Sequence, residues 1–178
     1  VVRTGAYLGG GFFRGSGVLR FDGDFVLNSG NIVGTGTMHV APTGSLALRG
    51  MTGWFVDVEG TATWGDYDMT FGQDTINGVP YSSVRVRPGA LLDIQHGITT
   101  PRELFGRGAT TGEVSAIQID GGAIMRKTTG TGISNIRPRV LLSGTVDVLD
   151  GSINVQGNCS VTGGDKTGPG QLTGCVFP

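Results

Sequence analysis

Short runs of alternating apolar and polar residues, separated by glycine, make up most of this chain. Three runs share one pattern, in which a strand ends in Val, and a short turn and a Gly precede further alternating positions. They read HVAPTGSLALRG (39–50), RVRPGALLDIQHG (85–97) and DVLDGSINVQG (147–157). A period of two places successive side chains on opposite faces of a β-strand. Each run therefore predicts short, half-buried strands that meet at a glycine corner.

The apolar positions after each glycine are expected to point into one core. They are Leu46 and Leu48 in the first run, Leu92 and Ile94 in the second, and Ile153 and Val155 in the third. A longer correspondence links LRFDGDFVLNSGNIVGTGTMHV (19–40) with IQIDGGAIMRKTTGTGISNI (117–136). Both stretches have a strand, an Asp-Gly turn, a second strand and a Gly-Thr-Gly corner before a further strand. The chain is therefore interpreted as an irregular repeat.

The spacing of the corner glycines predicts the architecture. Gly44, Gly89 and Gly151 are expected to mark equivalent corners, with Gly36 and Gly132 as a second pair. The interval from Gly44 to Gly89 is interpreted as two coils, and the interval from Gly89 to Gly151 as three. Each coil then has about 21 to 22 residues, within the range of β-solenoid repeats. We therefore expect a right-handed parallel β-helix (β-solenoid), of roughly eight coils by the same arithmetic.

This all-β solenoid is expected to form a single domain over residues 1–178. The alternative is a β-sandwich or jelly roll, which a chain of this length can also build. Aromatic residues make up only 7% of the chain, and small β-branched residues recur at regular turns, which favours the solenoid. Two loop excursions are expected, over residues 73–82 and 98–112. The second contains the one helix-like fragment, residues 101–105, where Pro101 is a suitable first helical residue and Gly106 ends the turn.

The composition agrees with a folded β protein. The chain has 34 glycines among 178 residues, about one in five, with no Gly-X-Y period; an ordinary globular protein has roughly 7%. Charged residues make up 15% and the formal net charge is −1, which argues against a disordered tail. Without a basic run, a nucleic-acid partner is not expected. No apolar stretch has the length that membrane insertion requires.

Candidate chemistry is sparse. Three carboxylate pairs, each two residues apart, are the candidates for a Ca²⁺ site or for acid–base chemistry at a glycosidic bond: Asp22 with Asp24, Asp57 with Glu59, and Asp66 with Asp68. The alternative is that they are solvated outward positions or turn residues. His39 and His96 are the only histidines and lie at the edges of two runs. Phosphate-cradling and nucleophile motifs are missing from the sequence, so no catalytic residue, metal or cofactor is expected.

Aromatic residues supply one candidate binding strip. Trp54, Trp64, Tyr67 and Tyr81 lie in or next to the region richest in aromatic residues. Exposed aromatic faces stack on sugar rings, so these four residues are candidates for contact with a glycan. The alternative is that they belong to the core or to an interface. A second cluster holds the arginines at 85, 87, 102 and 107, which are expected to pair with Asp or with a neighbouring subunit.

Two longer segments carry a resemblance to known repeats: SGNIVGTGTMHVAPTGSLAL and RKTTGTGISNIRPRVLLSGTVDVLDGSINVQG. The first is similar to one repeat, and the second to its companion repeat, of secreted β-solenoid surface proteins of the filamentous-haemagglutinin and autotransporter type. The resemblance covers residues 17–97 and 117–163. It implies a β-solenoid in an extracellular filament, adhesin or surface layer, generally without catalysis.

The cysteines fit this class. Cys159 and Cys175 lie near each other in a glycine-rich C-terminal stretch. In a secreted protein of this kind they are expected to form a disulfide, with two free thiols as the alternative. Residues 159–178 would then be a disulfide-stapled C-terminal cap or tail. Asn158-Cys159-Ser160 fits the glycosylation acceptor pattern, which makes Asn158 a candidate site.

The sequence therefore predicts a non-catalytic, extracellular or cell-surface structural protein. We expect a β-solenoid module of a surface filament, sheath or adhesin that stacks end to end on identical or related subunits. The alternatives are a carbohydrate-binding module, with polysaccharide as the partner, and a polysaccharide lyase or hydrolase built on the same scaffold.

Overall fold

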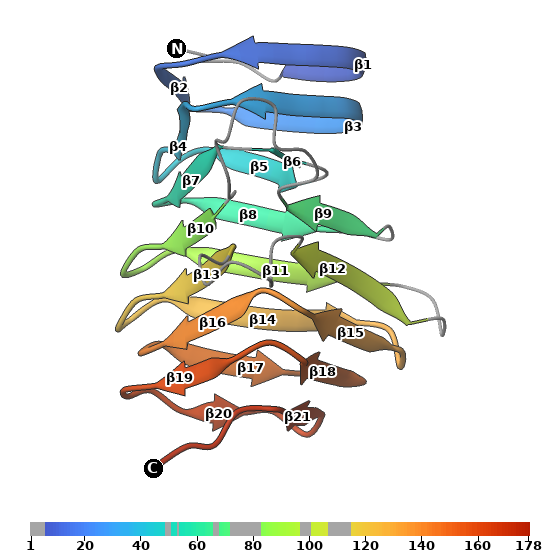
Figure 1. The fold of residues 1–178 in the computed structure, drawn as a ribbon. Coiled ribbons are helices and arrows are strands. Elements are labelled where there is room, and N and C mark those ends of the chain that lie inside the picture. The colour runs from blue at the N-terminus through green and yellow to red at the C-terminus, as the bar shows by residue number, and fades with distance from the viewer. Residues whose placement is uncertain are drawn as a thin grey trace.

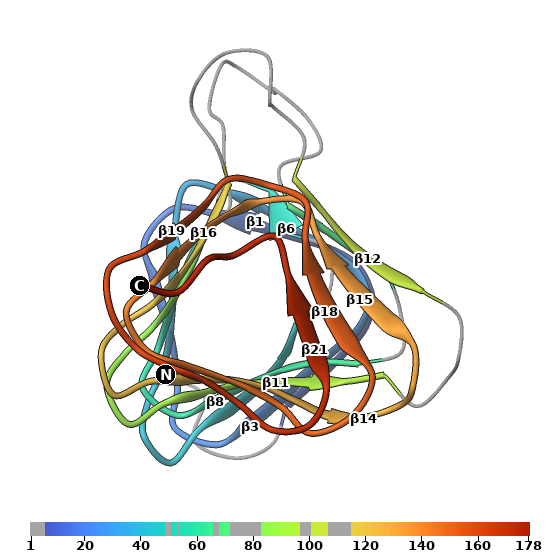
Figure 2. The same ribbon diagram turned by 90° about the horizontal axis from the view of Figure 1, so that it is seen from below.

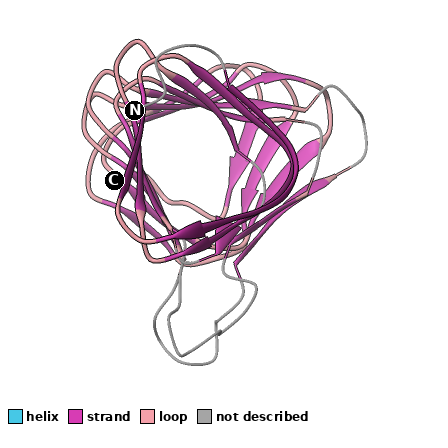
Figure 3. Cartoon of the chain, turned by 90° about the horizontal axis from the view of Figure 1, so that it is seen from above, coloured by secondary structure: helices cyan, strands magenta, loops and turns pink. Residues whose placement is uncertain are grey.

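The computed structural model describes residues 6–48, 51–52, 54–65, 68–71, 83–96, 101–106 and 115–178, and every regular element in them is a β-strand. The chain winds downward in stacked coils from the N-terminus to the C-terminus (Figure 1). Along the axis, the coils superpose as a three-sided ring (Figure 2, Figure 3). Neighbouring strands pair in parallel, and the winding is right-handed, as expected for a parallel β-helix.

Each side of the ring is a row of stacked strands. We call the rows the first, second and third faces, in the order in which a coil visits them. The first face is a separate sheet, which consists of β2 (Val18–Phe21), β4 (Thr37–Val40), β7 (Phe55–Val58), β10 (Ser83–Val86), β13 (Ala116–Ile119), β16 (Arg139–Leu142) and β19 (Cys159–Val161).

The second and third faces join in one larger sheet, because the long strand β3 (Asp24–Gly34) runs through both and pairs with β1 (Ala6–Gly15). After β3, the second face consists of β5 (Ser45–Leu48), β8 (Thr61–Trp64), β11 (Leu91–Gln95), β14 (Ile124–Thr129), β17 (Thr145–Val148) and β20 (Lys166–Thr167). The third face consists of β6 (Met51–Thr52), β9 (Met69–Phe71), β12 (Arg102–Gly106), β15 (Ile133–Ile136), β18 (Ser152–Val155) and β21 (Gln171–Thr173).

Alternation along each strand creates the core. Half of the side chains point into the ring, where they stack on the same position of the next coil. On the first face, one inward column is Phe21, Val40, Val58, Val86, Ile119 and Leu142, each at most 1% exposed. Each coil buries its apolar residues against its neighbours, so the stability of a coil depends mainly on the coils next to it.

The coil length is regular where no extra residues intervene. Ile133 pairs with Ser152, and Ile124 pairs with Thr145. Both coils therefore have about 20 residues, within the range of β-solenoid repeats. Leu91 pairs with Ile124 across a longer coil, because this coil contains one of the two expected excursions. Residues 73–82, 98–100 and 107–112 of those excursions lie outside the described residues. The expected total of about eight coils stays a prediction.

The register separates correct repeat assignments from wrong ones. Leu46 and Leu92 occupy the same inward column of the second face, because both are in register with Ala62. The equivalence of Gly151 with Gly44 and Gly89 is wrong. The first two glycines turn the chain from the first face to the second, whereas Gly151 lies between β17 and β18 and turns it from the second to the third. All three faces have the same alternation, so similar sequence does not identify the face.

The longer correspondence holds over its first half only. The strands β2 and β13 share the first face, and the turns at Asp22 and Asp120 that follow them lie at the same corner. The Gly-Thr-Gly segments then diverge, so the pairing of Gly36 with Gly132 is wrong. Gly36 precedes β4 on the first face, and Gly132 precedes β15 on the third. The reason is that β3 continues without a break through two faces.

The fragment expected to be helix-like is a strand. β12 begins at Arg102, directly after Pro101, and pairs in parallel with β9 and β15. A single turn of helix has little stability of its own, whereas the extended backbone completes the hydrogen bonds of strands on both sides. The neighbouring coils therefore override the local signal from Pro101.

Candidate functional site

Charged and polar side chains contact one another in a continuous row on the outer surface of the first face. Arg20 contacts Asp22 at 2.6 Å, and its Nη1 donates to Nδ1 of His39 at 3.0 Å. Because a guanidinium is only a donor, Nδ1 accepts and the ring proton of a neutral His39 lies on Nε2. That atom lies 3.3 Å from Glu59. These four residues link three successive coils.

Two further ion pairs continue this outer row. Arg87 binds Asp57 through two hydrogen bonds, of 2.6 Å and 3.0 Å. Arg85 donates to Asp120 at 2.8 Å, and Gln118 donates to the other oxygen of the same carboxylate at 2.8 Å. The expected pairing of Arg85 and Arg87 with Asp is confirmed within the chain.

Polar side chains also contact one another across coils on the second and third faces. On the second face, Asp147 accepts from Arg126 and from Thr167, each at 2.9 Å. On the third face, Asn154 donates to Asn135 at 2.8 Å and accepts from Thr173 at 2.9 Å. Each contact joins neighbouring coils, so these polar side chains hold the coils in register.

Two of the three carboxylate pairs are engaged in structural contacts. Asp22 contacts Arg20 and Asp24 accepts from Ser45, so the two carboxylates face different partners at a corner. Asp57 and Glu59 contact different side chains, Arg87 and His39. Asp66 lies outside the described residues. Across the part of the chain that the structure describes, no group of three or more His, Cys, Asp or Glu residues is arranged to hold a metal ion.

The two histidines lie in different environments. His39 points outward into the row of ion pairs, whereas His96 is buried at 1% exposure. The ring of His96 meets Trp64 edge-on, with ring centroids 4.4 Å apart, and its Nδ1 lies 2.9 Å from the Ser134 hydroxyl. The structure therefore does not bring the histidines together as a site.

The tryptophans do not form a surface strip. Trp54 is 2% exposed and Trp64 is 1% exposed, so neither presents a face to a glycan. An added Cβ at Gly36 would lie 2.5 Å from the Trp54 ring, which shows that the glycine makes room for the indole. The expectation of glycan contact is therefore wrong for both tryptophans, because their ring area is used in the core. Tyr67 and Tyr81 lie outside the described residues.

Sequence reasoning missed a lysine inside the solenoid. Lys127 is fully buried in the inward column of the second face that also holds Trp64, Ile94 and Val148. Its ammonium donates to the carbonyl of Thr129, the last residue of β14, at 2.9 Å. The alternation of the sequence indicates this inward position, because Lys127 follows the inward Met125 by two residues.

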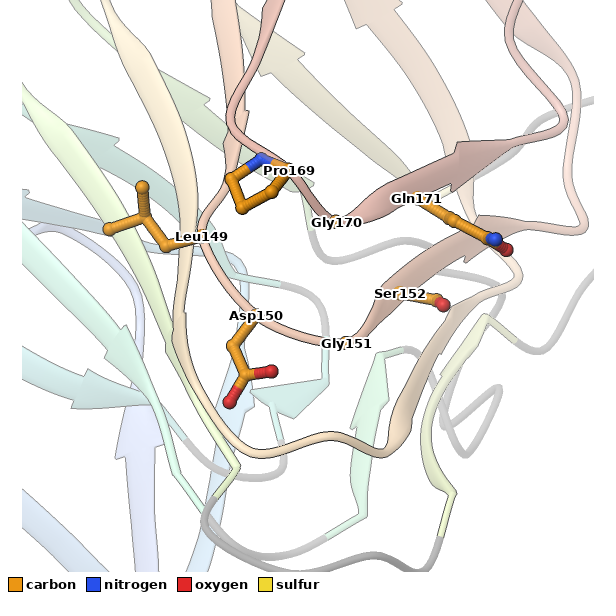
Figure 4. A pocket seen from close by; sticks show the side chains of 7 residues that line it. All are labelled: Leu149, Asp150, Gly151, Ser152, Pro169, Gly170 and Gln171. Carbon is orange, nitrogen blue, oxygen red and sulfur yellow. The ribbon is translucent and has the colours of Figure 1, made fainter.

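One open hollow lies at the corner between the second and third faces of the last two coils. It has a volume of about 390 Å³ and is lined by Leu149, Asp150, Gly151, Ser152, Pro169, Gly170 and Gln171. In Figure 4 the polar side chains do not converge: Asp150 points away from Ser152 and Gln171. A ligand site needs a few converging polar groups, so this hollow is not a strong binding site.

The last coil has the most distinctive chemistry. Cys159 and Cys175 form a disulfide, with 5.3 Å between their Cα atoms, as expected. After β21 the chain turns back toward the first face, and the C-terminus lies beside β19 and β16 (Figure 2). Cys175 and Phe177 are half-buried there and pack against the core together with Val161 and Leu172. Residues 159–178 are thus the final coil and the segment that covers it.

The disulfide indicates a non-reducing environment. Asn158 is exposed beside it, and its glycosylation stays a prediction. None of the described residues forms a helix long and apolar enough to cross a membrane. Comparison of this chain with family models, curated proteins and solved structures found no match.

Proposed function

We propose that this protein is a non-catalytic structural module of an extracellular or cell-surface assembly, a filament, sheath or adhesin stem. One observation supports this proposal above the others: the polar side chains of all three outer faces contact one another across coils. A β-helix enzyme needs carboxylates that are open to substrate, whereas Asp57, Asp120 and Asp147 are bonded to arginines.

A rigid rod follows from this arrangement. Each coil is joined to the next by parallel backbone ladders, by the inward columns and by the outer polar contacts. Bending the rod would disturb all three sets at once. The disulfide supports a location outside the reducing cytosol. The resemblance to secreted β-solenoid surface proteins agrees with this role, and identical or related subunits and polysaccharide are the proposed partners.

Imaging tests the proposal directly. An antibody raised against the folded chain is applied to intact source cells and detected by immunogold electron microscopy. The expected result is gold on the outer surface or on shed filaments, lost when the antibody is pre-absorbed with the folded protein. Gold confined to the cell interior would contradict the proposal.

An activity screen tests the enzymatic alternative. The purified chain is incubated with uronate polymers and neutral polysaccharides, with and without Ca²⁺. We expect no change in polymer size or in unsaturated products. Turnover that disappears in Asp57→Asn, but not in the matched exposed variant Asp165→Asn, would show an enzyme and overturn the structural role.

A further inference from the structure

The C-terminal end of the solenoid differs from the coils above it. In the preceding coil, the inward residues Val146, Val148 and Ile153 are fully buried. In the last coil, β20 is exposed throughout and β19 is only half-buried. The strands are also shorter, with three, two and three residues in β19, β20 and β21. The strands of this coil are thus shorter than those of the coil above it.

Lys166 is the clearest difference. It is in register with Val146 and, one coil earlier, with Met125, so it occupies an inward position that is otherwise apolar. Its ammonium donates to the carbonyls of Gly168 and Gly170, each at 2.6 Å, and stays exposed. A further coil stacked on this end would have to take that charge out of water and leave it only these two carbonyls, a costly desolvation that the stack above already carries at Lys127.

The covering segment adds a second obstacle. It leaves β21 at Gly174, which has a φ of +85°, and an added Cβ there would collide with the carbonyl oxygen of Val155. Beyond this turn, the disulfide ties Cys175 to β19, and Phe177 packs on the core. Through Cys175 and Phe177 the segment therefore packs on part of the core that a stacked coil would need to contact.

We propose that the last coil is a built-in terminator that prevents end-to-end stacking through this face, and that the latent partner of the face is a second copy of this chain. Short edge strands, an inward charge and a covering segment are the devices by which β proteins prevent edge-to-edge pairing. All three occur together on this end. This inference refines the proposed structural role, since self-assembly then has to use other surfaces, but its argument rests on the last coil alone.

The test compares the self-association of the unaltered chain with that of an uncapped variant, in which the covering segment no longer packs on the end of the core. The uncapped variant combines Cys159→Ser, Cys175→Ser, Phe177→Ser and Lys166→Val. Lys166→Val alone removes the charge and its two hydrogen bonds but leaves the covering segment in place. Thr167→Val is its control, because it places an apolar side chain on the outward side of the same strand and removes one hydrogen bond, to Asp147. Analytical ultracentrifugation over a concentration series measures the dissociation constant of the dimer, and hydrogen exchange reports the fold of β13 to β18.

We expect the unaltered chain and Thr167→Val not to associate through this end. The uncapped variant should dimerise at least tenfold more tightly, with new amide protection in β19 to β21. Lys166→Val should show part of that effect. An uncapped variant that keeps the protection of β13 to β18 and associates no more tightly than the unaltered chain would overturn the inference. An unaltered chain that dimerises with protection of β19 to β21 would overturn it as well. Surface labelling of cells is independent of both results, so the proposed function and the terminator can fail separately.

Discussion

Arg87 contacts Asp57 of the preceding coil through two parallel hydrogen bonds, 2.6 Å from Nε to Oδ1 and 3.0 Å from Nη2 to Oδ2. The hydrogen bond and the charge of Asp57 raise the pKa of the Arg87 guanidinium above its usual value. The stabilisation that corresponds to this raised pKa is fully present at every pH below the ordinary arginine pKa. It is lost only as the pH rises through the raised pKa. The titration of Arg87 therefore adds no pH dependence to stability near neutral pH.

Substitution of Arg87 should instead give a salt-dependent loss. We expect Arg87→Gln to lower the melting temperature, because the charge and both hydrogen bonds disappear. The melting temperature of Arg87→Lys should lie between those of the unaltered chain and Arg87→Gln, since a lysine keeps the charge but lacks the planar fork of donors. The difference should shrink in about 1 M NaCl, where the screening length falls to about 3 Å.

Scanning calorimetry at low and high salt measures this effect. Arg139→Gln is the control, because Arg139 is an exposed arginine on the outer side of the same face. Equal melting temperatures for Arg87→Gln and Arg139→Gln at low salt would show that the pair does not stabilise the coils.

Removal of the disulfide should destabilise the last coil locally. The two cysteines are separated by 16 residues, and closing a loop of that size stabilises a folded protein by about 3 kcal/mol in the chain-entropy account. The double variant Cys159→Ser and Cys175→Ser should therefore exchange amide hydrogens faster in residues 159–178, while the exchange of β13 to β18 changes little. Hydrogen exchange followed by mass spectrometry resolves the two regions. Uniformly faster exchange along the chain would show that the disulfide supports the whole stack.

The buried lysine gives a prediction for the core. Lys127→Ala should lower the free energy of unfolding by about 2–5 kcal/mol, the range for large-to-small core substitutions, because it leaves a cavity beside Ile94 and Val148 and removes the donor to Thr129. Lys127→Met keeps most of the volume and should cost less. Urea denaturation measures both, with the exposed Lys166→Ala as the control. A loss in Lys127→Ala no greater than in the control would contradict this role.

The sequence predicted those parts of the fold that depend on local pattern. Alternation identified Leu46 and Leu92 as one column, and the repeat spacing identified a solenoid. The face of the ring was not predictable for Gly151, because all faces share one alternation and only the register of β17 and β18 separates them.

The surface was harder to predict than the fold. Trp54 and Trp64 are large enough to serve either the core or a binding strip, and composition does not decide between these uses. The partner of a charged side chain also depends on register: Asp57 meets Arg87, 30 residues later, across a coil whose length includes an excursion. Lys127 was missed because charged residues are almost never fully buried unless paired.

Glycine is required at two corners for different reasons: at Gly144 a side chain would clash with the neighbouring coil, and at Gly89 the backbone has a positive φ. Gly144 and Gly89 both precede strands of the second face. An added Cβ at Gly144 would lie 2.5 Å from the carbonyl oxygens of Asp120 and Ala123 in the neighbouring coil. Gly89 has open space around that position but a φ of +83°. Gly89→Ala should therefore cost only the left-handed backbone strain, about 1–2 kcal/mol.

Gly144→Ala should cost more than Gly89→Ala, because the new methyl group pushes two coils apart and weakens the pairing of β14 with β17. Urea denaturation of both variants, with hydrogen exchange of β14 and β17, checks this order. Faster exchange in these strands is expected for Gly144→Ala alone. If Gly89→Ala proved the more damaging, backbone conformation rather than the close approach of the coils would set the demand for glycine at this corner.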